Sequence, residues 1–435
     1  MDKRFLGKLI SWPHYPWLVW GLAAAVFLIE YFARIAPAVM VDQLMMDFHV
    51  QALALGSLSA CFYYTYVGMQ IPAGLLLDRL NIRWLLVCMA LICAISCLLL
   101  ASSTHLSEAL LARALVGFGA AFAFIGTLKL VSLWFRPNQF GLLAGLTQSV
   151  GMLGAAMGQT SMAYLVTRIG WRHTLHSVAF SLMFIVLVLA IFLRTPVQKT
   201  RPVRKMSIWK ACGHLMDGLM IVLKNPQSWL NALLAGLLYA PTVIIAELWG
   251  VKFLQQTYHL STPYAASGIG LIFIGWTLGG PLTGWLSDHL GRRKLILGLS
   301  ALLSLIFISI FLFVPNLPLS VLFAVLFLYG MANTGVATTY AIAAELNSPA
   351  LSGTSVAFAN MASVLIGAVF QPVIGWLIDK NSVLERGVLV YSAYGFRVAM
   401  IILPVCLLLA MFVTLTIRED FNQEHVSHEE FAATV

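Results

Sequence analysis

Residues 74–79 read Gly-Leu-Leu-Leu-Asp-Arg, and residues 284–289 read Gly-Trp-Leu-Ser-Asp-His, the same short pattern 210 positions later. Each copy comes at the end of a long apolar run and is followed by basic residues. Three further matches share a spacing of 212 and pair Gly141, Gln148 and Gln159 with Gly353, Asn360 and Gln371. Two repeats this far apart predict a chain built from two related halves.

Apolar runs long enough to cross a membrane fill most of both halves. A span needs about 20 mostly apolar residues, because a helix rises about 1.5 Å per residue through about 30 Å of hydrocarbon. Twelve such runs lie near residues 17–41, 52–76, 84–103, 108–134, 141–166, 175–194, 229–251, 264–286, 294–314, 318–342, 353–378 and 394–417. The sequence therefore predicts an all-α polytopic membrane protein, with twelve transmembrane helices in two pseudo-symmetric six-helix bundles.

The composition excludes a soluble protein of this size. Of the 435 residues, 60% are hydrophobic and 10% are charged, whereas soluble domains have about 25% charged residues. The six cysteines show no metal-ligand or disulfide pattern. The net charge of +9 does not indicate nucleic-acid binding, because the basic residues are distributed by membrane side and form no patch.

Lysine and arginine positions predict the orientation. With a cytoplasmic N-terminus, 17 of the 26 Lys and Arg residues lie on the cytoplasmic side, as the positive-inside rule requires. The predicted parts are an N-terminal bundle over 1–194, a basic cytoplasmic connector over 195–227 with a surface helix near 207–223, a C-terminal bundle over 228–418 and a cytoplasmic tail over 419–435. Short loops and the lack of an Asn-x-Ser/Thr sequon favour a bacterial inner membrane.

The repeated pattern resembles the loop motif of the major facilitator superfamily, which follows the second and eighth spans in that family. The residues that carry the resemblance are Gly74, Asp78, Arg79 and Arg83 in the first copy, and Gly284, Asp288, Arg292 and Arg293 in the second. The first copy departs from the motif, with Asn81 at the place of a glycine. The resemblance implies a transporter in which charge-assisted hydrogen bonds from these loops stabilise the outward-open state. The basic residues also suit a role in setting topology.

Arg113 in the fourth span begins an Arg-x-x-x-Gly-x-Gly stretch that resembles a second motif of the same superfamily. Arginine is costly in hydrocarbon and is normally paired or turned to a watery cavity, so the resemblance implies a role in proton coupling. The alternative is an arginine that reaches back to the membrane surface. The fifth span lacks the Gly-Pro pair usual in drug and proton antiporters, which argues against a drug antiporter.

Glu30 and Arg34 are ionisable residues near the middle of the first span, four residues apart and so on one helix face. Tyr31-x-x-Arg34 resembles an element of organic-anion:cation symporters, in which the arginine faces the anionic substrate. Ala33 stands where those symporters carry an aspartate for proton coupling, so Glu30 is the candidate coupling residue. A neutralised pair that locks two helices is the alternative.

Other polar residues at membrane depth complete the predicted site. Lys129 offers a second positive charge or reaches the cytoplasmic surface, and tyrosines supply area plus a hydroxyl. The remaining candidates for substrate binding are Tyr63, Tyr66, Tyr239, Asn333, Asn360 and Gln371. Bonding between helices is the alternative for the amides. A gate contact is also expected between Glu247 and Lys252, near the far end of the seventh span.

The sequence contains no enzyme constellation and no phosphate-binding loop for ATP, so an ion gradient or the solute gradient must supply the energy. We predict a secondary active transporter of a small, anionic organic solute, working by alternating access as a proton-coupled importer, without a cofactor and as a monomer in lipid. One alternative is a proton-driven exporter of a drug-like compound or of a metabolite such as a siderophore. The other is a membrane scaffold or receptor with no transport activity.

Overall fold

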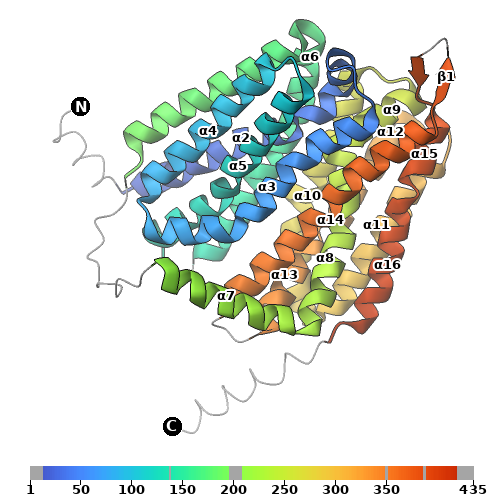
Figure 1. Cartoon of the computed structure of the whole chain (residues 1–435). Coiled ribbons are helices and arrows are strands. Elements are labelled where there is room, and N and C mark those ends of the chain that lie inside the picture. The colour runs from blue at the N-terminus through green and yellow to red at the C-terminus, as the bar shows by residue number, and fades with distance from the viewer. Residues whose placement is uncertain (1–12, 137–138, 195–207, 348–350, 386–387, 419–435) are drawn as a thin grey trace, which may run out of the picture.

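The computed structural model describes residues 13–136, 139–194, 208–347, 351–385 and 388–418. The chain is almost entirely helical, and its helices form two groups that lie side by side (Figure 1). In order, the elements of the first group are α2 (Tyr15–Asp47), α3 (Ala52–Arg79), α4 (Ile82–Ser102), α5 (Leu106–Trp134) and α6 (Phe140–Phe192). After α7 (Ile208–Lys224), the second group contains α8 (Pro226–Ile244), the π-helix η2 (Ile245–Trp249), α9 (Gly250–Tyr258), α10 (Thr262–Leu290), α11 (Arg293–Phe313), α12 (Leu319–Asn333), α13 (Val336–Glu345), α14 (Ser352–Lys380), α15 (Ala393–Met400) and α16 (Ile402–Thr416).

The predicted spans agree with these elements. Ten continuous helical segments in the described residues are long and apolar enough to cross a membrane. One of them, α6, covers two predicted spans, 141–166 and 175–194. Its backbone breaks between them at Gly170, where φ is +77°. If α6 is counted as two spans and α3, a helix of 28 residues outside these ten, is added, the predicted number of twelve fits the structure. The all-α membrane fold is therefore confirmed.

Packing repeats between the two groups. In the first group α2 packs on α6, α3 on α5 and α4 on α5. In the second group α8 packs on α14, α10 on α12 and α11 on α12. These are the contacts expected when two six-helix bundles share one fold, and they explain why short motifs recur 210 to 212 positions apart.

The two ends of the molecule differ. At one end, named here the α7 end, lie α7, the start of α2 and the end of α16. At the other end, named the hairpin end, two short antiparallel strands, β1 (Val383–Glu385) and β2 (Val388–Val390), connect α14 to α15 (Figure 1). This hairpin was not expected from the sequence. The surface helix predicted in the connector is present as α7.

The two groups meet most closely toward the hairpin end, along α3 with α14 and α6 with α10. A Cβ atom added to Gly56 would lie 2.6 Å from the Gln371 carbonyl oxygen, and one added to Gly375 would lie 2.3 Å from the Ala52 carbonyl oxygen. Toward the α7 end, Gly74 and Gly284 have open space where a Cβ would lie. The structure is therefore closed between the groups at the hairpin end.

Candidate solute-binding and coupling site

Arg34 lies in the middle of α2 and is 3% exposed. Its guanidinium forms an ion pair with Glu247 of the second group, with Nε 3.2 Å from Oε2 and Nη2 3.3 Å from Oε1. Arg34 therefore bonds across the two groups. The gate contact predicted between Glu247 and Lys252 is wrong, because Glu247 turns inward to Arg34 while Lys252 pairs with Asp42.

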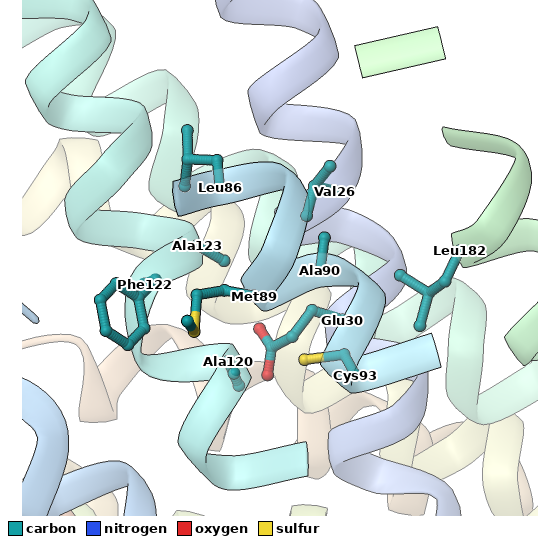
Figure 2. A pocket seen from close by; sticks show the side chains of 11 residues that line it. Val26, Glu30, Leu86, Met89, Ala90, Cys93, Ala120, Phe122, Ala123 and Leu182 are labelled. Carbon is teal, nitrogen blue, oxygen red and sulfur yellow. The ribbon is translucent and has the colours of Figure 1, made fainter. Parts of the chain in front are cut away.

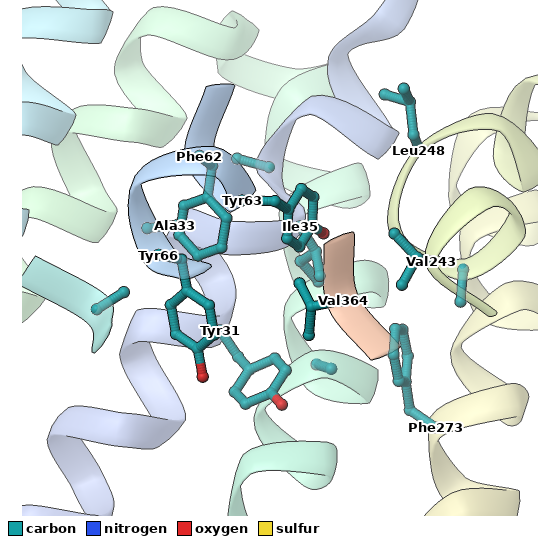
Figure 3. Close-up of a cluster of buried hydrophobic side chains, with 14 of the residues drawn as sticks. Tyr31, Ala33, Ile35, Phe62, Tyr63, Tyr66, Val243, Leu248, Phe273 and Val364 are labelled. Carbon is teal, nitrogen blue, oxygen red and sulfur yellow. The ribbon is translucent and has the colours of Figure 1, made fainter. Parts of the chain in front are cut away.

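Aromatic rings surround the Arg34 guanidinium. The guanidinium carbon lies 5.1 Å from the ring centre of Tyr31, 5.2 Å from that of Tyr63 and 5.5 Å from that of Tyr66. Phe62 stacks on Tyr66 with ring centres 5.7 Å apart, and Figure 3 shows these four rings gathered between α2 and α3. Such rings attract a cation through their faces, so they stabilise the charge of Arg34 without neutralising it.

Glu247 lies on the π-helix η2, directly after α8 and its internal Pro241. A π-helix shifts the backbone hydrogen bonds from i−4 to i−5 and often occurs at functional sites. Two buried glutamines hold this irregular backbone, since Gln159 donates to the Ala246 carbonyl at 2.8 Å and Gln371 to the Val243 carbonyl at 3.2 Å. These glutamines are the pair matched in the sequence at a spacing of 212, one from each half.

Tyr239 completes the Glu247 environment. Its hydroxyl donates to Glu247 Oε1 at 3.3 Å, and its ring packs on Trp276 with ring centres 5.5 Å apart. Among the predicted binding residues, the structure thus brings Tyr63, Tyr66 and Tyr239 together around Arg34 and its partner.

Arg113 is fully buried and bonds to the backbone of α2 beside Arg34. It donates to the Ala33 carbonyl at 2.7 Å and to the Arg34 carbonyl at 3.1 Å. Pro37 explains this arrangement: a proline has no N–H, so the Ala33 carbonyl, four residues earlier, lacks its helical donor. The side chain of Arg113 therefore supplies a missing hydrogen bond and does not extend to the membrane surface.

The glycines that follow Arg113 bring its helix close to its neighbours. A Cβ on Gly117 would lie 2.0 Å from the Phe62 carbonyl oxygen of α3, and one on Gly119 would lie 2.6 Å from the Met89 carbonyl oxygen of α4. The Arg-x-x-x-Gly-x-Gly pattern thus serves packing as well as hydrogen bonding.

Glu30 is 1% exposed and does not share the environment of Arg34. Its carboxyl group enters a small cavity between α2, α4 and α5, beside Met89, Cys93 and Ala120 (Figure 2). Neither carboxyl oxygen has a hydrogen-bond partner among the described residues. The cavity volume of about 10 Å³ is close to the space that one water molecule needs.

The predicted amides in the second half have structural partners. Asn333 is fully buried, accepts a hydrogen bond from Thr242 at 2.8 Å and donates to the Leu238 carbonyl at 2.9 Å. Asn360 accepts from the Tyr340 hydroxyl at 3.2 Å. These bonds match the alternative that the amides connect helices. The Asn333 bond also supplies a donor to a backbone carbonyl near Pro241.

Lys129 is half-buried in the last two turns of α5, toward the α7 end. Its role as a second positive charge for the solute remains a prediction.

The repeated loop motifs lie at the α7 end. Arg83 donates to the Ala190 carbonyl at the end of α6, and Arg293 pairs with Glu345. Asn81, at the place of the motif glycine, accepts from the backbone of Arg83 at 3.1 Å and so caps α4. In the second copy, Gly291 adopts φ of +60° after α10. Both motifs therefore attach helix ends to neighbouring helices.

Other motif residues are placed only in part. Asp78 and Asp288 are predicted motif residues whose side chains lie outside the described part of the structure. Arg79 and Arg292 are exposed at helix ends. A role of these loops in one transport state remains a prediction.

At the hairpin end, further polar contacts join the halves. Asp379, near the end of α14, accepts hydrogen bonds from the backbone N–H groups of Ala52 at 3.0 Å and Leu53 at 2.8 Å. These are the first two residues of α3, so Asp379 caps a helix of the other half. The Tyr391 hydroxyl donates to the same carboxylate at 3.0 Å.

We expect Asp379→Ala to favour opening at the hairpin end. Loss of a helix N-cap costs about 0.5–2 kcal/mol, or roughly a 2- to 30-fold shift between closed and open forms. Distances between spin labels on α3 and α14 at this end measure the shift. Asp47→Ala is the matched control, because Asp47 bonds to Trp171 and Arg172 within the first half. Unchanged distances in Asp379→Ala, or an equal shift in Asp47→Ala, would contradict the expectation.

Glu247 was expected to form a gate contact with Lys252, but in the structure it is the partner of Arg34. One signal was present: Glu247 is an acidic residue inside a predicted span, close to Pro241, in the half opposite Arg34. A charged residue at membrane depth needs a partner, and an acidic residue of the other half was the available one.

Comparison with known proteins places the chain among transporters. A family model described as Major Facilitator Superfamily matches residues 22–371. The uncharacterized transporter YybO of Bacillus subtilis is 32% identical over 159 residues, which cover 37% of this chain and 37% of that relative. The probable galactarate/D-glucarate transporter GudP of Escherichia coli is 24% identical over 393 residues, covering 82% of this chain and 85% of that protein.

A solved structure has the same fold. The inward-facing, occupied form of a bacterial homologue of the human lysosomal transporter Spinster aligns with a TM-score of 0.76 and 16% identity, covering 94% of this chain and 97% of that one.

Proposed function

Because the chain belongs to the Major Facilitator Superfamily, and so is an integral membrane transporter of organic solutes and not an enzyme, we propose that it is a secondary active transporter of a small organic anion. Uptake by proton symport is the proposed direction and coupling. The proposed substrate class includes sugar acids such as D-glucarate, which is named for a relative that covers most of the chain.

The observation that carries this proposal is the buried guanidinium of Arg34. A charged side chain at the centre of a membrane protein is costly and usually serves function. Arg34 presents two N–H donors to a carboxylate and is surrounded by three tyrosines. Its present partner is itself a carboxylate, which supports recognition of that group in a solute.

Neighbouring side chains suit a hydroxylated acid. The Tyr63 ring lies beside Arg34, and its buried hydroxyl has no hydrogen-bond partner among the described residues. A buried hydroxyl without a partner is unfavourable, and a solute hydroxyl would satisfy it. Tyr66 and Tyr239 complete the proposed binding surface, while Gln371 and Asn333 bond to the surrounding backbone. Asn360 and Lys129 are proposed as further contacts of the solute.

Proton coupling is proposed on the buried carboxyl groups. Glu30 has no ionic partner within hydrogen-bond distance among the described residues, and burial of an unpaired carboxylate favours its neutral form. Glu30 is therefore the sequence-based candidate for the proton site. Arg113 is proposed to assist coupling by positioning Arg34, because it donates to the carbonyls of Ala33 and Arg34.

The transport cycle is proposed to be alternating access between the two halves. With both termini on the cytoplasmic side, the hairpin end faces outward, and the closed contacts there describe an inward-facing form. The connector and tail are then cytoplasmic, and the loop motifs at the α7 end form the inner gate that closes in the outward-open state. A monomer in a bacterial inner membrane fits this proposal.

Binding and uptake of organic anions test the proposal. We expect D-glucarate to raise the thermal stability of the purified protein, because a ligand stabilises the form that it binds, and to accumulate in proteoliposomes under an inward proton gradient. The uncharged polyol D-sorbitol is the control. Failure of organic acids to bind, together with sensitivity to a toxic compound in a deletion strain, would instead favour the exporter.

A further inference from the structure

We propose that the anionic solute replaces Glu247 on Arg34, and that Glu247 then takes up the coupling proton. This inference rests on the proposed transport of an organic anion. The proton site is then Glu247, which the sequence predicted in a gate with Lys252, and not Glu30.

The first step is competition for Arg34. The Nε–Nη2 edge of the guanidinium is occupied by both oxygens of Glu247, at 3.2 and 3.3 Å. This is the edge with which a guanidinium binds a carboxylate through two parallel hydrogen bonds. A solute carboxylate requires the same two donors and binds there only when Glu247 moves away.

The second step follows from charge. Arg34 and Glu247 are 3% and 0% exposed and neutralise each other. A solute anion added to this cluster would leave one uncompensated negative charge in a low-dielectric interior, which is so costly that groups neutralise instead. A proton from the aqueous phase therefore forms an O–H bond on the displaced Glu247 carboxylate, and Arg34 with one solute carboxylate remains neutral. A solute with two carboxylates, such as D-glucarate, brings a second negative charge that needs a further proton or counter-charge, so the expected uptake is at least one proton.

The surroundings of Glu247 leave it as the group that accepts this proton. Arg34 and Tyr31 of α2 face it with Tyr239 of α8, whose hydroxyl donates to Oε1. From α6 and α14, the neutral amides of Gln159 and Gln371 bond to backbone near it. Lys252 of α9 pairs with Asp42, and α10 contributes the indole of Trp276 against Tyr239.

Glu30 is the remaining acidic neighbour, and its position differs. It lies on the same helix as Arg34, but its carboxyl group enters the separate cavity beside Cys93. A solute that binds Arg34 would displace no hydrogen-bond partner of Glu30, so binding frees no carboxylate there as it does at Glu247.

Solute and proton would together release a contact between the halves. Arg34 belongs to α2 and Glu247 to η2, so their ion pair ties the first group to the second. Once Glu247 is protonated, that tie is replaced by a solute held on Arg34. Coupling then arises because the tie is exchanged only when both solute and proton are present.

Proton uptake on binding tests the inference. In weakly buffered detergent solution, we expect the wild-type protein to take up at least one proton per D-glucarate bound, with affinity falling tenfold per pH unit while Glu247 is ionised in the free protein. Affinity is therefore highest at low pH and is lost as pH rises. Glu247→Gln should take up one proton fewer and lose this part of the pH dependence, and the count in Glu30→Gln separates the two candidate sites. Asp47→Asn, which changes a carboxylate bonded to Trp171 outside this cluster, should behave as the wild type.

Each outcome has a clear meaning. D-glucarate binding without proton uptake in the wild type, or an unchanged proton count in Glu247→Gln, would overturn the inference and leave anion transport standing. A lowered count in Glu30→Gln alone would return the proton site to Glu30. No binding of D-glucarate to the wild type would contradict both the proposed function and the inference. If Glu247→Gln does not fold, the count in Glu30→Gln decides, because a proton still taken up on binding assigns it to Glu247 and a lost proton assigns it to Glu30.

Discussion

Replacing Arg34 with lysine is expected to weaken D-glucarate binding and uptake by on the order of 100-fold. Lysine keeps the positive charge, so Glu247 retains an ionic partner and the buried cluster stays neutral. Lysine cannot, however, present the two parallel donors with which a guanidinium holds a carboxylate. Loss of one of the two hydrogen bonds to the charged solute group costs about 1.5–3 kcal/mol, or roughly 10- to 160-fold in affinity, which sets the size of the expected loss.

Arg172→Lys is the matched control for this prediction. Arg172 also pairs with a carboxylate, that of Asp47, but it lies at the partly exposed hairpin end of the first half. Calorimetric binding and proteoliposome uptake of D-glucarate measure both variants. Wild-type affinity in Arg34→Lys, with folding intact, would remove Arg34 from solute binding.

Replacing Arg113 with methionine is expected to destabilise the protein by roughly 1–3 kcal/mol, because the buried Ala33 carbonyl would lose the donor that Pro37 cannot supply. Arg113 also donates to the Arg34 carbonyl, which in an α-helix has the backbone N–H four residues on as a second donor. Since Arg34 lies on this backbone, solute binding should weaken as well. Thermal and denaturant unfolding in detergent measure the loss.

A second substitution makes this prediction specific. Pro37→Ala restores an N–H that can bond the Ala33 carbonyl, so the double variant Arg113→Met/Pro37→Ala should recover part of the stability that Arg113→Met loses. Pro241→Ala is the control, because that proline lies in α8, away from Arg113. Equal effects of Arg113→Met with and without Pro37 would show that the arginine does not compensate for the proline.

The fold was predictable because the membrane restricts the choices. Backbone groups in hydrocarbon must bond internally, so long apolar runs become helices. The run from 141 to 194 nevertheless forms one helix with a break at Gly170, since the polar residues between the two predicted spans are compatible with helix. The β1–β2 hairpin had no such constraint, and its short strands were not recognised.

The site was predictable only where one residue carried the signal. Arg34 stands out as a cation in an apolar run, and the tyrosines of α3 follow from their position. The partner of Arg34 did not follow, because helix periodicity pointed to Glu30 four residues earlier, whereas Glu247 lies 213 residues away. Arg113 and Pro37 were each visible in the sequence, but only the packing of α5 against α2 connects them.

The most direct measurement is a structure of the protein determined with bound D-glucarate. We expect a carboxylate of D-glucarate to contact the Arg34 guanidinium, with Glu247 beyond hydrogen-bond distance of that side chain. An intact pair between Arg34 and Glu247, with D-glucarate bound elsewhere in the protein, would contradict recognition of the anion by Arg34.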